Sequence, residues 1–164
     1  MNRRHLLKIA CLAAVSATGL ESLAEPEGQR SPNVRPDPKD IARLAHHYTA
    51  AWNSKSPHAV ASFFAEDGAI VINRGEPWVG RERIAEMAAG FFADVPDMAL
   101  TCDEIRCAGS HALYVWTFTG HDAKTGHALK VRGWEEWDVD ADLKVISSRG
   151  WYDAEDYAAQ VAGS

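Results

Sequence analysis

The fold can be worked out from HALKVRGWEEWDV, residues 127–139. Its apolar and charged residues alternate, which is typical of a β-strand whose side chains point to opposite faces of a sheet. On that alternation Glu135 and Trp137 share one face, and Trp134 and Glu136 share the other. Whichever face is buried, a carboxylate is buried together with an indole, and this combination needs an explanation.

Three further strand-like runs lie on either side of this stretch. They are MALTCDEIRCA (98–108), HALYVWTFTGH (111–121) and LKVISSRGWY (143–152). The short segments AGS, DAKTG and DAD separate the four runs and are typical of turns. Four strands joined by short turns predict an antiparallel meander.

The residues before the meander favour helices. A helical apolar spacing behind an Asp-Pro start predicts a helix over 38–54, and Ser56-Pro57 begins a second helix that we expect to end at Gly68. A short strand is predicted over 69–73 and a third helix over 80–93.

Three helices followed by a long antiparallel sheet indicate the α+β class. Long strands have to bend around the three helices. A strongly curved, mostly antiparallel sheet that closes over helices leaves a cavity, and the mouth of such a cavity is a natural ligand site.

Length and composition agree with one domain. The chain has 164 residues, 46% of them hydrophobic and six of them tryptophan, so a substantial core is expected. We place the domain at residues 37–158, with a tail at 159–164. The last residues, from 153 onward, are expected either to form a short helix or to fray.

The N-terminal residues predict export. MNRRHLLK is basic, and IACLAAVSATGL is apolar but too short to span a bilayer as a helix. Residues 1–24 are therefore expected to be a bacterial signal peptide, with Arg3-Arg4 resembling a twin-arginine signal. The general secretory route and an uncleaved tail remain open. Residues 25–36, polar and rich in proline, predict a disordered linker, and the protein is expected to be periplasmic or secreted, with no membrane span once the signal is cleaved.

Charge and motifs exclude several function classes. A net charge of −6 without a basic stripe argues against nucleic-acid binding. The sequence has neither metal-ligand spacing nor a glycine-rich phosphate loop, so no metal and no cofactor is expected. Cys102 and Cys107 are predicted on opposite faces of a strand, ~16 Å apart, which is beyond the ~7 Å limit for a disulfide.

The segment YTAAWNSKSPHAVASFFAEDGAIVINRGEPWVGRERI, residues 48–84, carries a family resemblance. Its marks are a helix ending in Trp-Asn, the Phe-x-x-Asp-Gly junction and the Gly-Arg-x-x-Ile start of the next helix. Together with the meander, they resemble the nuclear-transport-factor-2-like superfamily, in its SnoaL-like and ketosteroid-isomerase-like branches, over about residues 38–157. The resemblance implies a cone-shaped, cystatin-like α+β barrel, a fold that hosts isomerases, dehydratases, cyclases, epoxide hydrolases and non-catalytic binders.

The resemblance to ketosteroid isomerase also implies roles for individual residues. The family's oxyanion tyrosine falls on Tyr48, and its hydrogen-bond-donating strand acid falls on Glu135. The family's catalytic base falls on Ile72, next to Asn73, so that acid is missing here. In SnoaL-like cyclases a polar pocket residue falls on His121, while their acid/base aspartate corresponds either to Asp122 or to Glu135.

We weigh each candidate against a structural role. Tyr48 is expected either to donate to a substrate oxygen or to be a core tyrosine. Glu135, buried beside Trp137, gains a raised pKa and serves as an acid, base or donor, unless it pairs with Arg149 or Arg132 or lies solvated at the rim. His121 is a rim acid/base or a turn residue.

The remaining candidates are expected to bind substrate. Asn73 orients a substrate or caps a turn. The aromatic candidates line the cavity or belong to the core, and they are Trp52, Trp116, Phe118, Trp137 and Tyr152.

Two functions follow from these expectations. The first is a cofactor-independent isomerase, dehydratase or cyclase that acts on a small, apolar, oxygenated molecule, with Tyr48 polarising an oxygen and Glu135 moving a proton. The alternative is a non-catalytic module that binds a small hydrophobic ligand or serves to oligomerise. The face that carries Trp134 and Glu136 is expected to form a homodimer, although a solvated face fits the sequence equally well.

Overall fold

The structure is a computed structural model, and it describes residues 36–164. The predicted signal peptide (1–24) and all but the last residue of the predicted linker (25–36) lie outside the described residues. The element order is α1 (Pro38–Asn53), α2 (Pro57–Ala61), β1 (Phe64–Ile72), β2 (Trp78–Val79), α3 (Arg81–Asp94), β3 (Ala99–Ala108), β4 (His111–His121), β5 (Ala128–Val139), β6 (Val145–Tyr152) and α4 (Ala154–Ala162).

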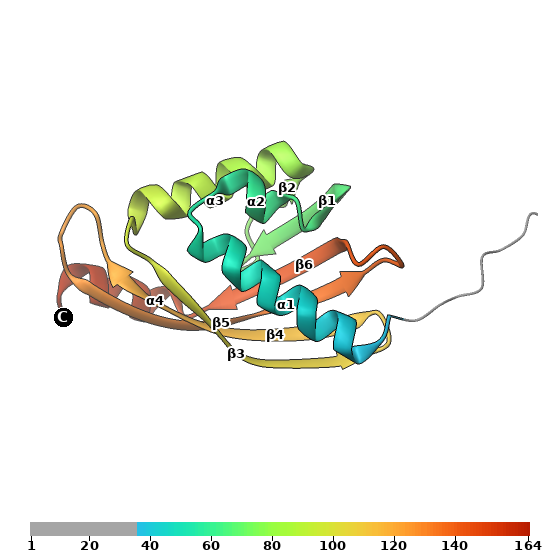
Figure 1. Ribbon diagram of the computed structural model, residues 1–164. Helices are drawn as coiled ribbons and strands as arrows, with labels where there is room; N and C mark the ends of the chain where they lie inside the picture. The colour runs from blue at the N-terminus through green and yellow to red at the C-terminus, as the bar shows by residue number, and fades with distance from the viewer. Residues whose placement is uncertain (1–35) are drawn as a thin grey trace, which may run out of the picture. The chain divides into compact units, whose positions relative to one another are not determined.

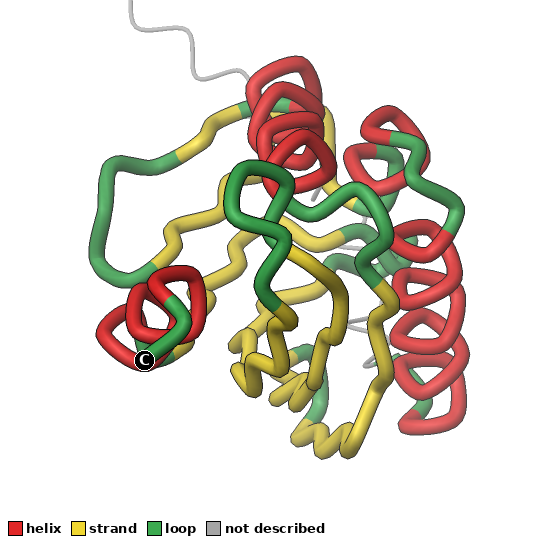
Figure 2. The backbone as a smooth tube through the Cα atoms, turned by 90° about the vertical axis from the view of Figure 1, so that its left-hand side faces the viewer, coloured by secondary structure: helices red, strands yellow, loops and turns green. Residues whose placement is uncertain are grey.

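The six strands form one curved, open sheet in the order β2-β1-β6-β5-β4-β3. Strands β3 to β6 pair antiparallel with their neighbours in sequence, as predicted, and β1 joins the sheet parallel to β6. Helices α1, α2 and α3 lie on one face of the sheet, and α4 lies apart from them beside one end of it (Figures 1 and 2). The predicted α+β fold with a strongly curved, mostly antiparallel sheet is confirmed.

Helix α1 forms where its sequence predicts. The side chain of Asp37 accepts a hydrogen bond from the backbone N–H of Lys39 (2.8 Å), and Pro38 occupies the first turn, where no N–H is needed. The residues at helical spacing are buried against the sheet and the other helices: Ile41, Leu44, Ala45, Tyr48, Ala51 and Trp52.

The second helix is shorter than predicted. It ends at Ala61, and β1 begins at Phe64, so the prediction of helix up to Gly68 is wrong. Phe64 pairs with Val145 of β6 and is fully buried, while the next paired residue is Ala69. The intervening bulge needs Gly68, because a Cβ there would lie 2.7 Å from the carbonyl oxygen of Val145. Pairing with a distant strand therefore overrides the local helical pattern.

A second bulge corrects the prediction for the cysteines. The pairing of β3 with β4 shifts between Cys102 and Glu104, so one extra residue is inserted. Cys102 lies opposite Trp116 and Cys107 opposite Ala112, both on the buried face of β4. The two thiols, which are both free, therefore share a face instead of pointing to opposite ones.

Strand β5 buries the face that contains Glu135. Leu129, Val131 and Trp137 are buried on the same face as Glu135, whose exposed fraction is 7%. Gly133 lies in this row because the ring of Trp116 covers it, and a Cβ there would lie 2.4 Å from that ring.

Helix α4 completes the described chain. It begins at an Asp153 N-cap and ends at Gly163, which adopts the left-handed conformation (φ 76°) typical of a helix C-terminus. The helix thus continues past residue 158, where the sequence places the end of the domain. Within residues 36–164, no helix has the length and apolar character needed to cross a membrane.

Candidate active site

The carboxylate of Glu135 is the centre of the buried site. Its Oε2 accepts hydrogen bonds from the indole N–H of Trp137 (2.9 Å), the hydroxyl of Ser148 (2.9 Å) and the hydroxyl of Tyr48 (3.4 Å). Three elements supply the donors: β5 itself, the neighbouring strand β6 and helix α1. All three bonds end on Oε2, so Oε1 is the oxygen without a donor among the described residues.

Burial dominates the acidity of Glu135. Removal from water raises the pKa of this carboxyl above its ordinary value of 4.5, because the charged form loses its solvation. The donors Trp137, Ser148 and Tyr48 lower the pKa, since each stabilises the anion, but they do not offset the burial. The alternatives of a salt bridge or a solvated rim do not apply: Arg149 contacts Glu136, and Arg132 contacts Asp103.

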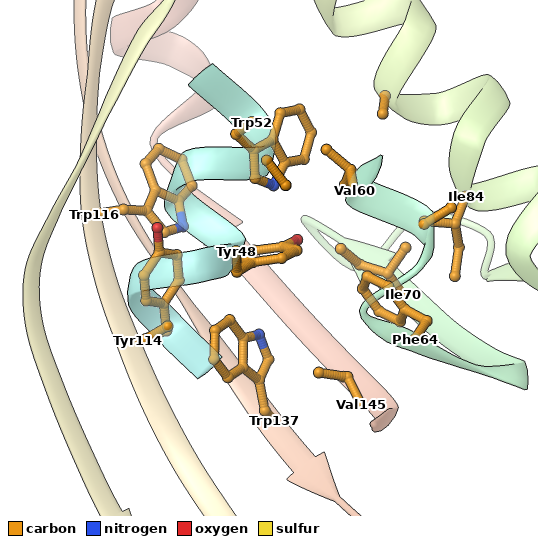
Figure 3. Packing of buried hydrophobic residues seen from close by; sticks show 14 of the residues in the cluster. Tyr48, Trp52, Val60, Phe64, Ile70, Ile84, Tyr114, Trp116, Trp137 and Val145 are labelled. Carbon is orange, nitrogen blue, oxygen red and sulfur yellow. The ribbon is translucent and has the colours of Figure 1, made fainter. Parts of the chain in front are cut away.

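Tyr48 lies behind the carboxylate, within the aromatic core. Its ring makes edge contacts with Trp137 (5.2 Å between centroids), Tyr114 (5.7 Å) and Trp52 (6.2 Å), as Figure 3 shows. Burial, followed by the nearby charge of Glu135, raises the pKa of this phenol well above 10.0. Tyr48 therefore remains a neutral donor, and the bond it makes is to Glu135.

A cavity lies on the other side of Glu135. Five predicted site residues line it: Trp52, Trp116, Phe118, Glu135 and Tyr152. Ile72, the position of the missing family base, also lines it, and further apolar side chains complete the wall, including Ile70, Met87, Phe91, Met98 and Leu100. Among the lining residues, all in the described part of the chain, Glu135 is the one carboxylate.

The cavity is small. The centre of a water molecule has about 50 Å³ in which to move, whereas one water needs ~10–15 Å³ on this measure. The space therefore holds only a few waters or a molecule of similar size. A ligand that requires the ~300 Å³ typical of drug-sized sites has to extend beyond it.

Two cavity-lining tryptophans carry unsatisfied donors. The indole nitrogens of Trp52 and Trp116 are buried and have no partner at good hydrogen-bond geometry within residues 36–164, although the Trp52 side chain lies near enough to the Tyr48 hydroxyl to lower the pKa of that phenol. A buried N–H without an acceptor costs ~1–3 kcal/mol. Neither nitrogen is accessible from the cavity, so an oxygen atom of a ligand reaches one of them only if the indole moves.

The other predicted residues lie away from the cavity wall. Trp137 is fully buried and supports Glu135. Asn73 adopts a left-handed conformation (φ 48°) after β1, and its side-chain oxygen accepts from the backbone N–H of Tyr152 (3.0 Å). His121 is exposed. The carboxylate of Asp97 accepts a hydrogen bond from the backbone N–H of His121 (2.8 Å), and its other oxygen is hydrogen-bonded to the ring Nδ1 (2.6 Å).

Ser148 is the polar residue of the site that sequence reasoning missed. It is 1% exposed and makes one of the two short bonds to Glu135. It lies four positions before Tyr152, so alternation along the strand places both on the same face. That spacing is the pattern that identifies Ser148, once Tyr152 is assigned to the cavity.

Within residues 36–164, His, Cys, Asp and Glu side chains nowhere form a group of three or more that holds a metal ion.

The chain resembles known proteins both in sequence and in fold. A family model described as a SnoaL-like domain matches residues 45–147. A search of curated proteins found no match.

Solved structures share the fold at low sequence identity. A hypothetical protein from Catenulispora acidiphila with a ketosteroid-isomerase-like fold, determined in complex with trimethylamine, is 23% identical; the alignment covers 73% of this chain and 92% of that one, with a TM-score of 0.68. TsrD from Streptomyces laurentii is 18% identical over 79% and 99% of the two chains, with a TM-score of 0.69. A putative SnoaL-like polyketide cyclase from Jannaschia is 12% identical over 74% and 94%, with a TM-score of 0.64.

Proposed function

This chain belongs to the SnoaL-like domain family, and from that premise we propose that it is a cofactor-independent enzyme of the isomerase, dehydratase or cyclase type. Its substrate is a small, mostly apolar molecule that carries an oxygen. The observation that carries the proposal is the buried carboxylate of Glu135, held by three donors on one oxygen and lying in the wall of an apolar cavity.

The geometry supports Glu135 as the group that moves the proton. Tyr48, Trp137 and Ser148 hold Oε2, and in this proposal Oε1 takes a proton from the substrate as a general base. The raised pKa brings the carboxyl closer to neutral pH, where a base and its conjugate acid are both accessible.

The unsatisfied indole N–H groups support an oxygenated substrate. In this proposal a substrate carbonyl, hydroxyl or ether oxygen accepts from Trp116 or Trp52, with small side-chain movements, as negative charge develops on it. Tyr48 does not take that role here, because its hydroxyl is bonded to Glu135. It acts as a positioning residue.

The second candidate is a non-catalytic module that binds a small ligand in the same cavity. It is favoured by Ile72, which stands where the related isomerases carry their catalytic acid. The small, apolar cavity fits simple binding as well as it fits chemistry.

One experiment separates the two. Native mass spectrometry identifies the molecule that co-purifies with the protein, and that molecule is then incubated with wild type, Glu135→Gln and Glu136→Gln. Glu136 is the matched control because it lies next in sequence but points to the opposite face of β5. An enzyme loses turnover in Glu135→Gln alone. A binding module returns the molecule unchanged in all three proteins.

We also propose that two copies associate through the outer face of the sheet. Val115, Trp134 and Trp151 lie in one cross-strand row over β4, β5 and β6. Both indoles are partly exposed, Trp134 to 37% and Trp151 to 39%. Exposed aromatic side chains in a row are typical of an interface.

Export to the periplasm or the medium is likewise a proposal, and it rests on the pattern of residues 1–24. Fusion of these residues to a reporter tests it. Replacement of Arg3 and Arg4 by lysine blocks the twin-arginine route and leaves the general secretory route open.

A further inference from the structure

A second hollow lies beside the inner cavity. The centre of a water molecule has about 300 Å³ in which to move there. Ile72, Met87, Phe91 and Tyr152 line both spaces, so the two adjoin, and a ligand path between them would pass these four side chains. A ligand too large for the inner cavity therefore extends into this outer hollow.

The charged groups of the outer hollow are all acidic. Asp94 and Glu86 line it, and none of its lining residues is basic. Glu86 is paired with Arg83, whose guanidinium lies over the ring of Trp78 at 4.7 Å. Asp94 has no cation within salt-bridge distance in the described part of the chain. It is the last residue of α3, where the helix carbonyls add partial negative charge.

Aromatic rings form another part of the wall. Tyr152 and Tyr157 meet edge to face, with 5.8 Å between centroids, and Phe91 lies at the boundary with the inner cavity. Burial raises the pKa of both phenols, and the charge of Asp94 raises it further, so the carboxylate and the two rings act on each other. Aromatic faces beside an anion are the chemistry that attracts an ammonium group.

A specific contact holds this wall in place. Gln160 of α4 accepts from the backbone N–H of Lys130 (2.7 Å) and donates to its carbonyl oxygen (3.1 Å). Lys130 lies on β5 beyond the last residue that pairs with β6, which is Gly133. The side-chain amide of Gln160 thus takes the place of a strand peptide, and it fixes the helix that carries Tyr157.

We propose that the ligand of this path is a small amine that enters as an ammonium. Its cationic group lies between Asp94 and the rings of Tyr152 and Tyr157, and its apolar, oxygenated part passes Phe91 toward Glu135. Carboxylate and phosphate ligands are rejected, because both spaces contain acids and no base. The inference rests on the proposed function for the role of Glu135, but the ammonium site itself lies in the outer hollow.

Three probes of one size test the charge preference. n-Butylammonium, 1-butanol and butyrate are titrated into the folded protein, and binding is followed by the NMR shifts of the tyrosine and tryptophan rings. We expect n-butylammonium to bind most tightly, with shifts at Tyr152 and Tyr157, and butyrate to bind least. Added salt should weaken the binding of n-butylammonium and leave the binding of 1-butanol unchanged. Equal or tighter binding of butyrate overturns the proposal.

Two variants assign the effect to Asp94. Asp94→Asn is expected to weaken the binding of n-butylammonium about fivefold, which corresponds to a cation contact of ~1 kcal/mol. The affinity for 1-butanol should stay the same. Glu82→Gln removes a charge from an exposed site on the same helix, outside the hollow, and should change neither. Equal effects of the two variants, or no effect of Asp94→Asn, contradict the ammonium site.

The proposed function fails separately. If Glu135→Gln leaves turnover unchanged, the catalytic role is wrong, but the preference for n-butylammonium and its dependence on Asp94 remain. If Asp94→Asn has no effect while Glu135→Gln abolishes turnover, the proposed enzymatic function is supported and the proposed ammonium site is wrong.

Discussion

The hydroxyl of Tyr48 lies 3.4 Å from Oε2 of Glu135, although the two residues are 87 positions apart in the chain. The contact joins helix α1 to strand β5 across the aromatic core. It places Tyr48 behind the carboxylate, and the cavity in front of it. The chemistry of the site therefore depends on one carboxylate and on the three groups that hold it.

The rate of the proposed reaction is expected to depend on the pKa of Glu135. A general base acts as the anion, so kcat/KM should rise with pH through the pKa of the free enzyme, which burial places above 4.5. The measurement is a pH–rate profile with the co-purifying molecule. A rate that falls with pH over the same range would assign Glu135 as the acid instead.

Stability should fall as pH rises through the same range. The folded state holds the proton of Glu135 more tightly than the unfolded chain does, so it binds more protons between the ordinary pKa of 4.5 and the raised value. The contribution of Glu135 to the free energy of unfolding therefore decreases as the pH rises across that window. Urea denaturation at several pH values measures it. In Glu135→Gln this decrease should be absent, whereas Glu136→Gln should retain it.

Loss of a donor should raise the pKa of Glu135 further. Ser148→Ala and Tyr48→Phe each remove one hydrogen bond to the anion, and a bond to a charged group contributes ~1.5–3 kcal/mol, or about one pKa unit or more. Ser148 lies closer (2.9 Å) than Tyr48 (3.4 Å), so its loss should have the larger effect. NMR titration of the glutamate side-chain carbons checks the order. An unchanged pKa in both variants would show that burial alone sets it.

A methyl group at Gly133 should destabilise the fold. Its carbon would lie 2.4 Å from the ring of Trp116 and 2.5 Å from the carbonyl oxygen of Trp151, so either the indole or the strand has to move. We expect a loss of ~1–3 kcal/mol in the free energy of unfolding. Gly90→Ala is the control. It lies in α3 with nothing within 4 Å of the added carbon, and it should stabilise by ~0.5–1 kcal/mol.

The outer face of the sheet should control self-association. Trp134→Arg places a charge in the row that pairs Val115, Trp134 and Trp151, and it is expected to convert a dimer into monomers. Ala89→Arg adds the same charge at an exposed position of α3 and should leave the dimer intact. Sedimentation velocity at micromolar concentration reads the result. A monomeric wild type would contradict the proposal.

Much of the fold could be predicted from local patterns. Asp37 and Ser56 begin their helices because each accepts a backbone hydrogen bond in the first turn. The alternation of β5 placed Glu135 and Trp137 on the same face, and burial of the acid beside an indole followed from it. These features depend on neighbours in the sequence, so a reader of the sequence has all the information that they need.

Local patterns in the sequence therefore predicted the class of fold, the positions of most helices and strands, and the placement of Glu135 and Trp137 on one face of β5. Only the tertiary structure decided the rest: that β1 begins at Phe64, that a bulge turns Cys102 and Cys107 to one face, and that Ser148 donates to the carboxylate. It also decided that Tyr48 and Trp137 support Glu135 from behind while Trp116 and Tyr152 face the cavity. The physical reason is that these outcomes depend on strand order and register. A strand is free to satisfy its own alternation in any register, and pairing with a distant partner selects the one in which the core is filled and the buried polar groups find their donors.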